Sequence, residues 1–360
     1  MRTYFRLPAL ALASLLLCSA SSIAQNPAPR FHDPADSAKI MGVVTRYLAF
    51  MPNDTIPNAM VDLLTAGEMQ KRLIASHGLP VRFPAPFIYT LSAPRSVRDN
   101  DSLAIVTAAV SSGIVPLFGP LTVDWVFFLQ PVDNAWRLTA IRRLAGIEDA
   151  VAQMNQLDSS NYPLKLKKII AAETGRTLLS NDQIRQHFRD HSVDFQRLAE
   201  NFRRPGHDSI WMMGRTDRVI TQVNNFGISW GDAAQNIPHD VAEEFLAKLP
   251  REQQAGLRAQ LRQAEETRKE GYDSLARIAK RIGITTKRLD SMVMMMHDLG
   301  ISFANTRLPW KGAVQFTLGG HFDDVVGLIY SPGGGVPLVS PREYFYVEQI
   351  AEGWWMFRST

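Results

Sequence analysis

The chain contains almost no cysteine. Its 360 residues include a single one, Cys18, so no disulfide can form within the chain. Many small exported domains depend on disulfides because their cores are too small to hold them together. This chain must rely on packing instead, and it is long enough to bury a sizeable core.

Two further features are missing, namely a strong charge of one sign and a long hydrophobic run after the N-terminal region. The formal net charge is +4, and Arg2 and Arg6 contribute two of those charges. Such a small surplus is too weak to hold nucleic acid. Beyond the first residues, no stretch approaches the 18 or more apolar residues of a transmembrane helix. We therefore expect no nucleic-acid partner and no transmembrane anchor in the mature chain.

The N-terminal residues themselves are typical of an export signal. A positively charged start is followed by an apolar run from Leu7 to Leu17, and Ser22-Ile23-Ala24 places small residues where a signal peptidase cleaves. The apolar run is about half as long as a bilayer-spanning helix. We expect residues 1–24 to be removed and the mature chain to be periplasmic or secreted.

The periodicity of apolar residues predicts two units of similar plan. A proline-rich leader at 25–35 precedes the first unit, 36–146, in which two helices are followed by four strands. The helices are expected at 36–51 and 58–76, and the strands at 87–91, 102–111, 121–130 and 135–144. This order of elements is typical of an α+β layer arrangement.

The second half repeats that order. Residues 147–206 are expected to form a helical connector, and 207–360 a helical hairpin followed by a β-meander. Strands of the meander are expected at 313–318, 322–330, 344–350 and 353–358. The predicted fold is therefore α+β, with two helix-plus-antiparallel-meander units joined by a helical connector.

One hairpin of the first unit resembles a known superfamily. Trp125-Val126-Phe127-Phe128-Leu129, a short turn and Trp136-Arg137-Leu138 are similar to the last hairpin of the nuclear-transport-factor-like superfamily of cone-shaped, cystatin-like α+β domains. The resemblance covers roughly residues 36–146. It implies a concave sheet and assigns no activity, since members of that superfamily range from cavity enzymes to non-catalytic assembly modules.

A serine motif supports one alternative function. Gly227-Ile228-Ser229-Trp230-Gly231 matches the G-x-S-x-G nucleophile elbow, which would make Ser229 the nucleophile of a serine hydrolase. The context is unfavourable, because Pro238 is too near for a full helix after the motif. The strands also cluster in antiparallel blocks, whereas a hydrolase sheet is parallel. The competing interpretation is a glycine-flanked turn.

A histidine pair supports a second alternative. His187 and His191 are four residues apart on an expected helix, so both could face one metal. Phe188 stands where a zinc protease has its catalytic Glu, and a zinc site would need a third ligand from elsewhere. His191 also lies on the apolar stripe of the helix, which favours a role at the edge of the core. No sequence motif predicts a cofactor.

Aromatic residues crowd the C-terminal strands and support the leading hypothesis. Neighbouring residues of a strand point to opposite faces, so Trp354 and Trp355 cannot both face inward. An outward Trp beside Tyr is suited to binding a protein, peptide or glycan, unless a helical layer covers that face. We therefore predict a non-catalytic binding or assembly module of the cell envelope. The predicted binding residues are Trp310, Tyr344, Tyr346, Trp354 and Trp355.

Overall fold

The computed structural model describes most of the chain after the leader. The described ranges are 34–50, 56–76, 88–97, 102–144, 147–203, 211–213, 222–224, 227–229, 246–252, 283–321 and 324–359, together with residues 244, 254–256, 258–259, 262 and 279–280. They contain helices and two mainly antiparallel sheets, which confirms the predicted α+β class. The predicted signal lies outside the described residues.

The first unit consists of three helices followed by a sheet. The helices are α1 (Pro34–Leu48), α2 (Asn58–Leu64) and α3 (Gly67–Ser76), and the strands are β1 (Ile88–Leu91), β2 (Arg95–Ser96), β3 (Ala104–Val115), β4 (Gly119–Val132) and β5 (Ala135–Arg142). The strands run in the order β1-β3-β4-β5, and β2 also pairs with β3. The helix predicted at 58–76 is interrupted, because Thr65 is extended and forms a bridge to Leu138 of β5.

Strand β4 is buried on both of its faces. Every residue from Val123 to Leu129 is buried, although a sheet with one solvent-facing side would show alternation. On one face the ring of Phe127 packs edge-on against Tyr47 of α1, with ring centroids 6.2 Å apart. The opposite face carries Asp124, whose carboxylate contacts Asn181 of the helical connector and Arg358 of the second unit. The first sheet is thus enclosed between its own helices and the C-terminal half.

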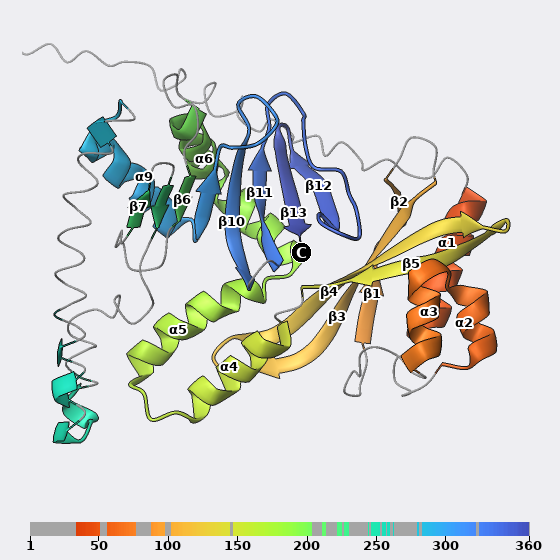
Figure 1. The fold of residues 1–360 in the computed structure, drawn as a ribbon, viewed down its shortest axis with the longest axis horizontal. Helices are drawn as coiled ribbons and strands as arrows, with labels where there is room; N and C mark the ends of the chain where they lie inside the picture. Colours follow the sequence, from red (N-terminus) through yellow and green to blue (C-terminus); the bar gives the residue numbers. More distant parts are fainter. Residues whose placement is uncertain are drawn as a thin grey trace, which may run out of the picture.

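Three helices connect the two units: α4 (Ile147–Ser159), α5 (Leu164–Thr177) and α6 (Asn181–Arg203). A capping box forms at the start of α6. The Ser180 amide donates to Gln183 Oε1 at 2.8 Å, and the Gln183 amide donates to Ser180 Oγ at 3.3 Å. In Figure 1, α4 and α5 lie side by side, with α4 in contact with β3 and α5 in contact with β10 (Val314–His321).

The second sheet is built from short strands and the C-terminal meander. Its elements are β6 (Trp211–Met213), β7 (Gln222–Asn224), β8 (Gly227–Ser229), β9 (Phe303–Asn305), β10 (Val314–His321), β11 (Asp324–Tyr330), β12 (Tyr346–Ala351) and β13 (Trp354–Ser359), with α9 (Thr286–Asp298) before β9. The strand order is β12-β13-β11-β10-β9-β6-β8-β7, and β6 and β8 pair in parallel. The four meander strands match the predicted ones closely.

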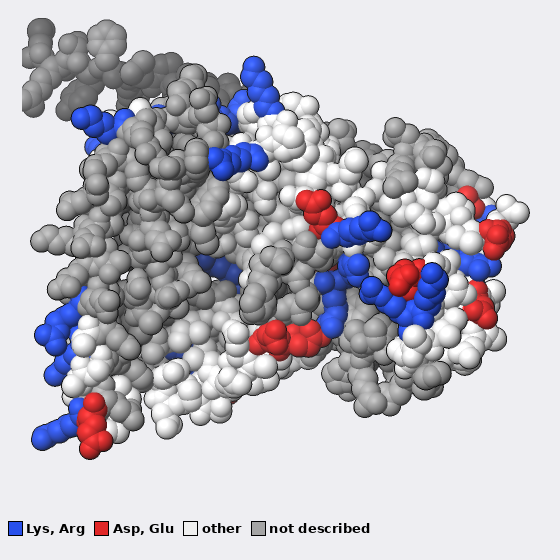
Figure 2. Space-filling model, in the orientation of Figure 1, with Lys and Arg blue, Asp and Glu red and all other residues white. Residues whose placement is uncertain are grey.

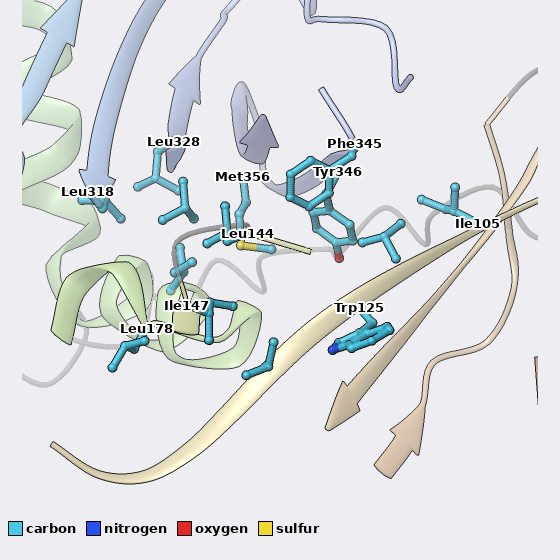
Figure 3. Close-up of a cluster of buried hydrophobic side chains, with 14 of the residues drawn as sticks. Ile105, Trp125, Leu144, Ile147, Leu178, Leu318, Leu328, Phe345, Tyr346 and Met356 are labelled. Carbon is cyan, nitrogen blue, oxygen red and sulfur yellow. The ribbon is translucent and has the colours of Figure 1, made fainter. Parts of the chain in front are cut away.

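One apolar core runs through both units. Trp354 of β13 packs on α6, with its ring centroid 5.1 Å from Phe188 and 5.9 Å from Phe195. The same buried cluster continues from α1 through β4 to β13. Figure 3 shows part of the region that joins the units, with buried side chains from β3, β4, α4 and the C-terminal strands. The C-terminal sheet therefore packs directly on the first unit.

Candidate functional site

The five predicted binding aromatics divide into two groups. Tyr346 is 2% exposed and Trp354 is 3% exposed, so neither side chain lines a surface. Trp310, Tyr344 and Trp355 are half-buried. The prediction of an outward Trp beside Tyr therefore applies to the second group only, and Tyr346 and Trp354 belong to the core.

Trp355 lies on the face of the second sheet that points away from α6. Trp354 faces α6, and adjacent residues of a strand point to opposite sides, so Trp355 faces outward. Its partners in register are Ile329 of β11 and Gln349 of β12. We call the half-buried Trp310, Tyr344 and Trp355, with the side chains around them, the outer aromatic face.

A small second core lies under the outer aromatic face. Ile329, Val347 and Phe357 are buried there, and Tyr344 packs on Phe357 with ring centroids 5.7 Å apart. The apolar side chains at its rim are Leu308, Val325, Val336, Val339, Tyr344 and Trp355. Several of these come from the loops before β10 and β12, so among the described residues loops supply this cover.

The loop before β12 packs against Trp310 and exposes an apolar side chain beside the outer aromatic face. Trp310 lies against Gly335 so closely that a Cβ at residue 335 would be 2.1 Å from the indole ring, which only glycine permits. Leu338 on the same loop is 88% exposed. Burial raises the pKa of Tyr344, and the Glu343 carboxylate acts in the same direction, so its hydroxyl stays neutral. The face thus offers apolar contact area with a neutral hydrogen-bonding group.

A buried ion pair joins the two units at the opposite face of the second sheet. Arg358 Nη2 of β13 donates to Asp124 Oδ2 of β4 at 3.3 Å, with the two side chains 2% and 5% exposed. The backbone amide of Asn181, at the start of α6, donates to the same oxygen at 2.7 Å. Arg358 also donates to Asn181 Oδ1 and to the carbonyl of Leu179, at 2.7 Å each. Asp124 therefore acts as an anionic cap of α6.

A second set of charges adjoins this pair. Arg185 of α6 donates to Glu348 of β12 at 2.6 Å and to the Tyr346 hydroxyl at 3.1 Å. The guanidinium of Arg95 of β2 lies 4.8 Å from the centre of the Tyr346 ring. We call Arg95, Asp124, Asn181, Arg185, Tyr346, Glu348 and Arg358 the junction network.

Electrostatics at the junction network fit a structural role. Burial raises the pKa of the Asp124 carboxyl, while the Arg358 guanidinium and the Asn181 amide act in the opposite direction. Burial also lowers the pKa of Arg358 and raises that of Tyr346. The removal of these charges from water is therefore costly, and internal partners compensate for it. Groups engaged in this way hold the units together and are not available to a substrate.

The predicted histidine pair is brought together. His187 Nε2 is 2.8 Å from the carbonyl oxygen of Leu299, and the ring centroids of His187 and His191 are 4.9 Å apart. The backbone at His191 leaves the helical region, with φ −124° and ψ 19°. Within the part of the chain that is described, no group of three or more His, Cys, Asp or Glu side chains could hold a metal ion.

Ser229 ends strand β8, which pairs with β6 and β7. Trp230 and Gly231, which complete the G-x-S-x-G motif, lie outside the described residues, and so do the positions that a helix after the motif would occupy. The serine-hydrolase alternative therefore stays a prediction.

Over the first unit, on the right of Figure 2, Lys and Arg lie next to Asp and Glu. Among the helices of the described ranges, none combines the length and the apolar character needed to cross a bilayer.

Comparison with known proteins gave no relative. No family model matches the chain, and neither the curated proteins nor the solved structures contain a significant match.

Proposed function

We propose that this protein is a non-catalytic binding module of the cell envelope, and that the outer aromatic face is its binding surface. The partner is a protein, peptide or glycan. One observation carries the proposal: Trp355 and Tyr344 are half-buried on a sheet face that α6 does not cover.

The chemistry of this face suits recognition. A half-buried Trp is already held by its neighbours, so little side-chain freedom is lost when a partner covers the rest of the ring. Trp and Tyr each combine a large apolar surface with a polar group, which is why they are frequent at interfaces. The exposed Leu338 adds aliphatic area at the rim.

The junction network supports the same function indirectly. It ties β4, α6 and β13 together through buried hydrogen bonds, so the opposite side of β13 is a rigid platform for Trp355. A rigid surface binds more tightly because it loses less conformational freedom on association.

The envelope location belongs to the proposal as well. It depends on removal of residues 1–24, and recovery of a chain that starts at Gln25 from the envelope fraction would support it. The likeness of the first unit to nuclear-transport-factor-like domains is also proposed. Its support is that α1 covers the face of a sheet whose last hairpin carries Trp125 and Trp136.

The test uses capture of partners by the immobilised mature protein from envelope extract. Trp355→Ala and Tyr344→Ala remove the proposed contacts, while Leu164→Ala on α5, an exposed apolar residue away from this face, is the matched control. We expect a species that wild type and the control retain and that both aromatic variants lose, with unchanged circular dichroism. Equal capture by all four proteins would contradict the proposal.

A further inference from the structure

We propose that His187 and His191 form a two-histidine site for a divalent transition metal, with solvent completing the coordination. The site lies in the middle of α6, where the C-terminal end of α9 packs on it. It is separate from the outer aromatic face, so it is a second property of the molecule and does not depend on the proposed binding function.

The distance between the two rings supports a shared metal ion. A metal bound to an imidazole nitrogen at about 2.0–2.1 Å lies about 3.2 Å from the ring centroid. Two such rings, at bond angles of about 90–110°, have centroids about 4.5–5.2 Å apart. The observed separation of the His187 and His191 centroids is 4.9 Å, with the rings tilted by 56°. The pair is therefore already spaced for one shared ion.

The hydrogen bond of His187 fixes the tautomer that a metal ligand needs. A carbonyl oxygen only accepts, so the Nε2 atom 2.8 Å from the Leu299 carbonyl must carry the proton. The Nδ1 atom of the neutral ring then has a free lone pair. Histidines that bind metals usually donate their other N–H to a carbonyl or carboxylate in this way, which fixes the tautomer and the ring orientation. The Leu299 carbonyl supplies that support for His187.

Partial burial and packing also favour a metal site at the pair. Both side chains are half-buried, so the rings are held by packing while solvent still reaches the site. His187 also packs edge-on against Phe195, with ring centroids 5.6 Å apart. These contacts hold the rings in place before a metal binds.

The ligand set determines the class of metal. Two imidazoles with water favour Cu²⁺, Ni²⁺ and Zn²⁺ over Mg²⁺ and Ca²⁺, which prefer oxygen ligands. Among the first three, affinity for nitrogen ligands is highest for Cu²⁺. Within the described part of the chain no third protein ligand joins the pair, so water occupies the other positions and the ion exchanges readily.

The test is isothermal titration of the mature protein with CuCl₂, NiCl₂, ZnCl₂ and MgCl₂ at pH 7.5. We compare wild type with His187→Gln, His191→Gln and the control His297→Gln. His297 is another half-buried histidine, but it bonds to Asp298 within its own helix. Wild type and the control should bind one equivalent of Cu²⁺, and each variant of the pair should lose about tenfold or more in affinity.

Electron paramagnetic resonance of the Cu²⁺ complex supplies a second readout that does not depend on the folding of any variant. Coupling to two imidazole nitrogens would support the site. The inference is overturned if wild type binds no stoichiometric Cu²⁺, if both variants of the pair bind as wild type does, or if the spectrum shows fewer than two imidazoles.

Discussion

Replacement of the charges in the junction network should reveal strong coupling between the two units. Asp124→Asn leaves Arg358 charged and without an anionic partner at a position where its side chain is 2% exposed. Loss of one partner of a buried pair costs about 3–5 kcal/mol of the free energy of unfolding. Arg358→Met leaves Asp124 in the corresponding state, with a similar cost. If the two effects were independent, the double variant would lose about 6–10 kcal/mol.

The double variant should instead resemble a single one. It no longer contains an uncompensated charge, so the remaining penalty comes from acceptors that Arg358 leaves behind. These are the Leu179 carbonyl and Asn181 Oδ1, and each unsatisfied buried group costs about 1–3 kcal/mol. We therefore expect a total loss of about 2–6 kcal/mol and a coupling energy of several kcal/mol.

Urea unfolding followed by tryptophan fluorescence measures these free energies for wild type, both single variants and the double variant. Asp36→Asn is the matched control, because Asp36 pairs with Lys39 at a site where the side chains are 33% and 64% exposed. The control should lose less than about 1 kcal/mol. Additive losses in the double variant, or an Asp124→Asn effect as small as that of the control, would refute the role assigned to the pair.

Three further predictions concern the backbone, a helix cap and pH. Gly327→Ala should destabilise the protein by about 1–3 kcal/mol or prevent folding, because the new Cβ would lie 2.0 Å from the Phe316 carbonyl oxygen. Gly42→Ala is its control, since no atom lies within 4 Å of the new Cβ. In the same urea assay this control should be neutral or stabilise α1 by up to about 1 kcal/mol. Ser180→Ala removes the capping hydroxyl of α6 and should lower the thermal midpoint, at a cost of about 1 kcal/mol, whereas Ser180→Thr should retain most of the stability. The folded state favours neutral His187, because burial lowers its pKa below the ordinary value of 6.5. The contribution of His187 to the free energy of unfolding should therefore be constant above that pH and decrease as the pH falls below it. Urea titrations at pH 7.5 and 5.5 should show this decrease in wild type and a smaller one in His187→Gln; equal decreases would contradict it.

Local patterns predicted the C-terminal strands well but failed for one helix of the first unit. The meander strands β10 to β13 were found near their expected positions, because turn residues such as Gly333 to Gly335 separate them clearly. The predicted helix 58–76 failed at Thr65 for a tertiary reason. The Ala66 amide donates to the Leu138 carbonyl of β5 at 2.9 Å, a contact that no local pattern encodes.

The site could be predicted only in part. Alternation along the strand required Trp354 and Trp355 to face opposite sides, but it could not say which of them faces the core. The sequence interpretation missed the junction network, because the two residues of its ion pair, Asp124 and Arg358, are 234 residues apart. One signal was present: Asp124 stands alone among apolar residues of a strand, and a carboxylate buried there requires a cationic partner. The sequence does not identify Arg358 as that partner.

Site-specific photo-cross-linking in the intact envelope tests the outer aromatic face most directly. A photoreactive residue replaces Leu338, which is 88% exposed, and in a separate protein it replaces Leu164, which is 61% exposed on α5. We predict a discrete adduct from position 338 that disappears when Trp355→Ala is added, and none from position 164. An adduct that forms equally from both positions, or that persists in the Trp355→Ala background, would contradict the assignment of this face as the binding surface.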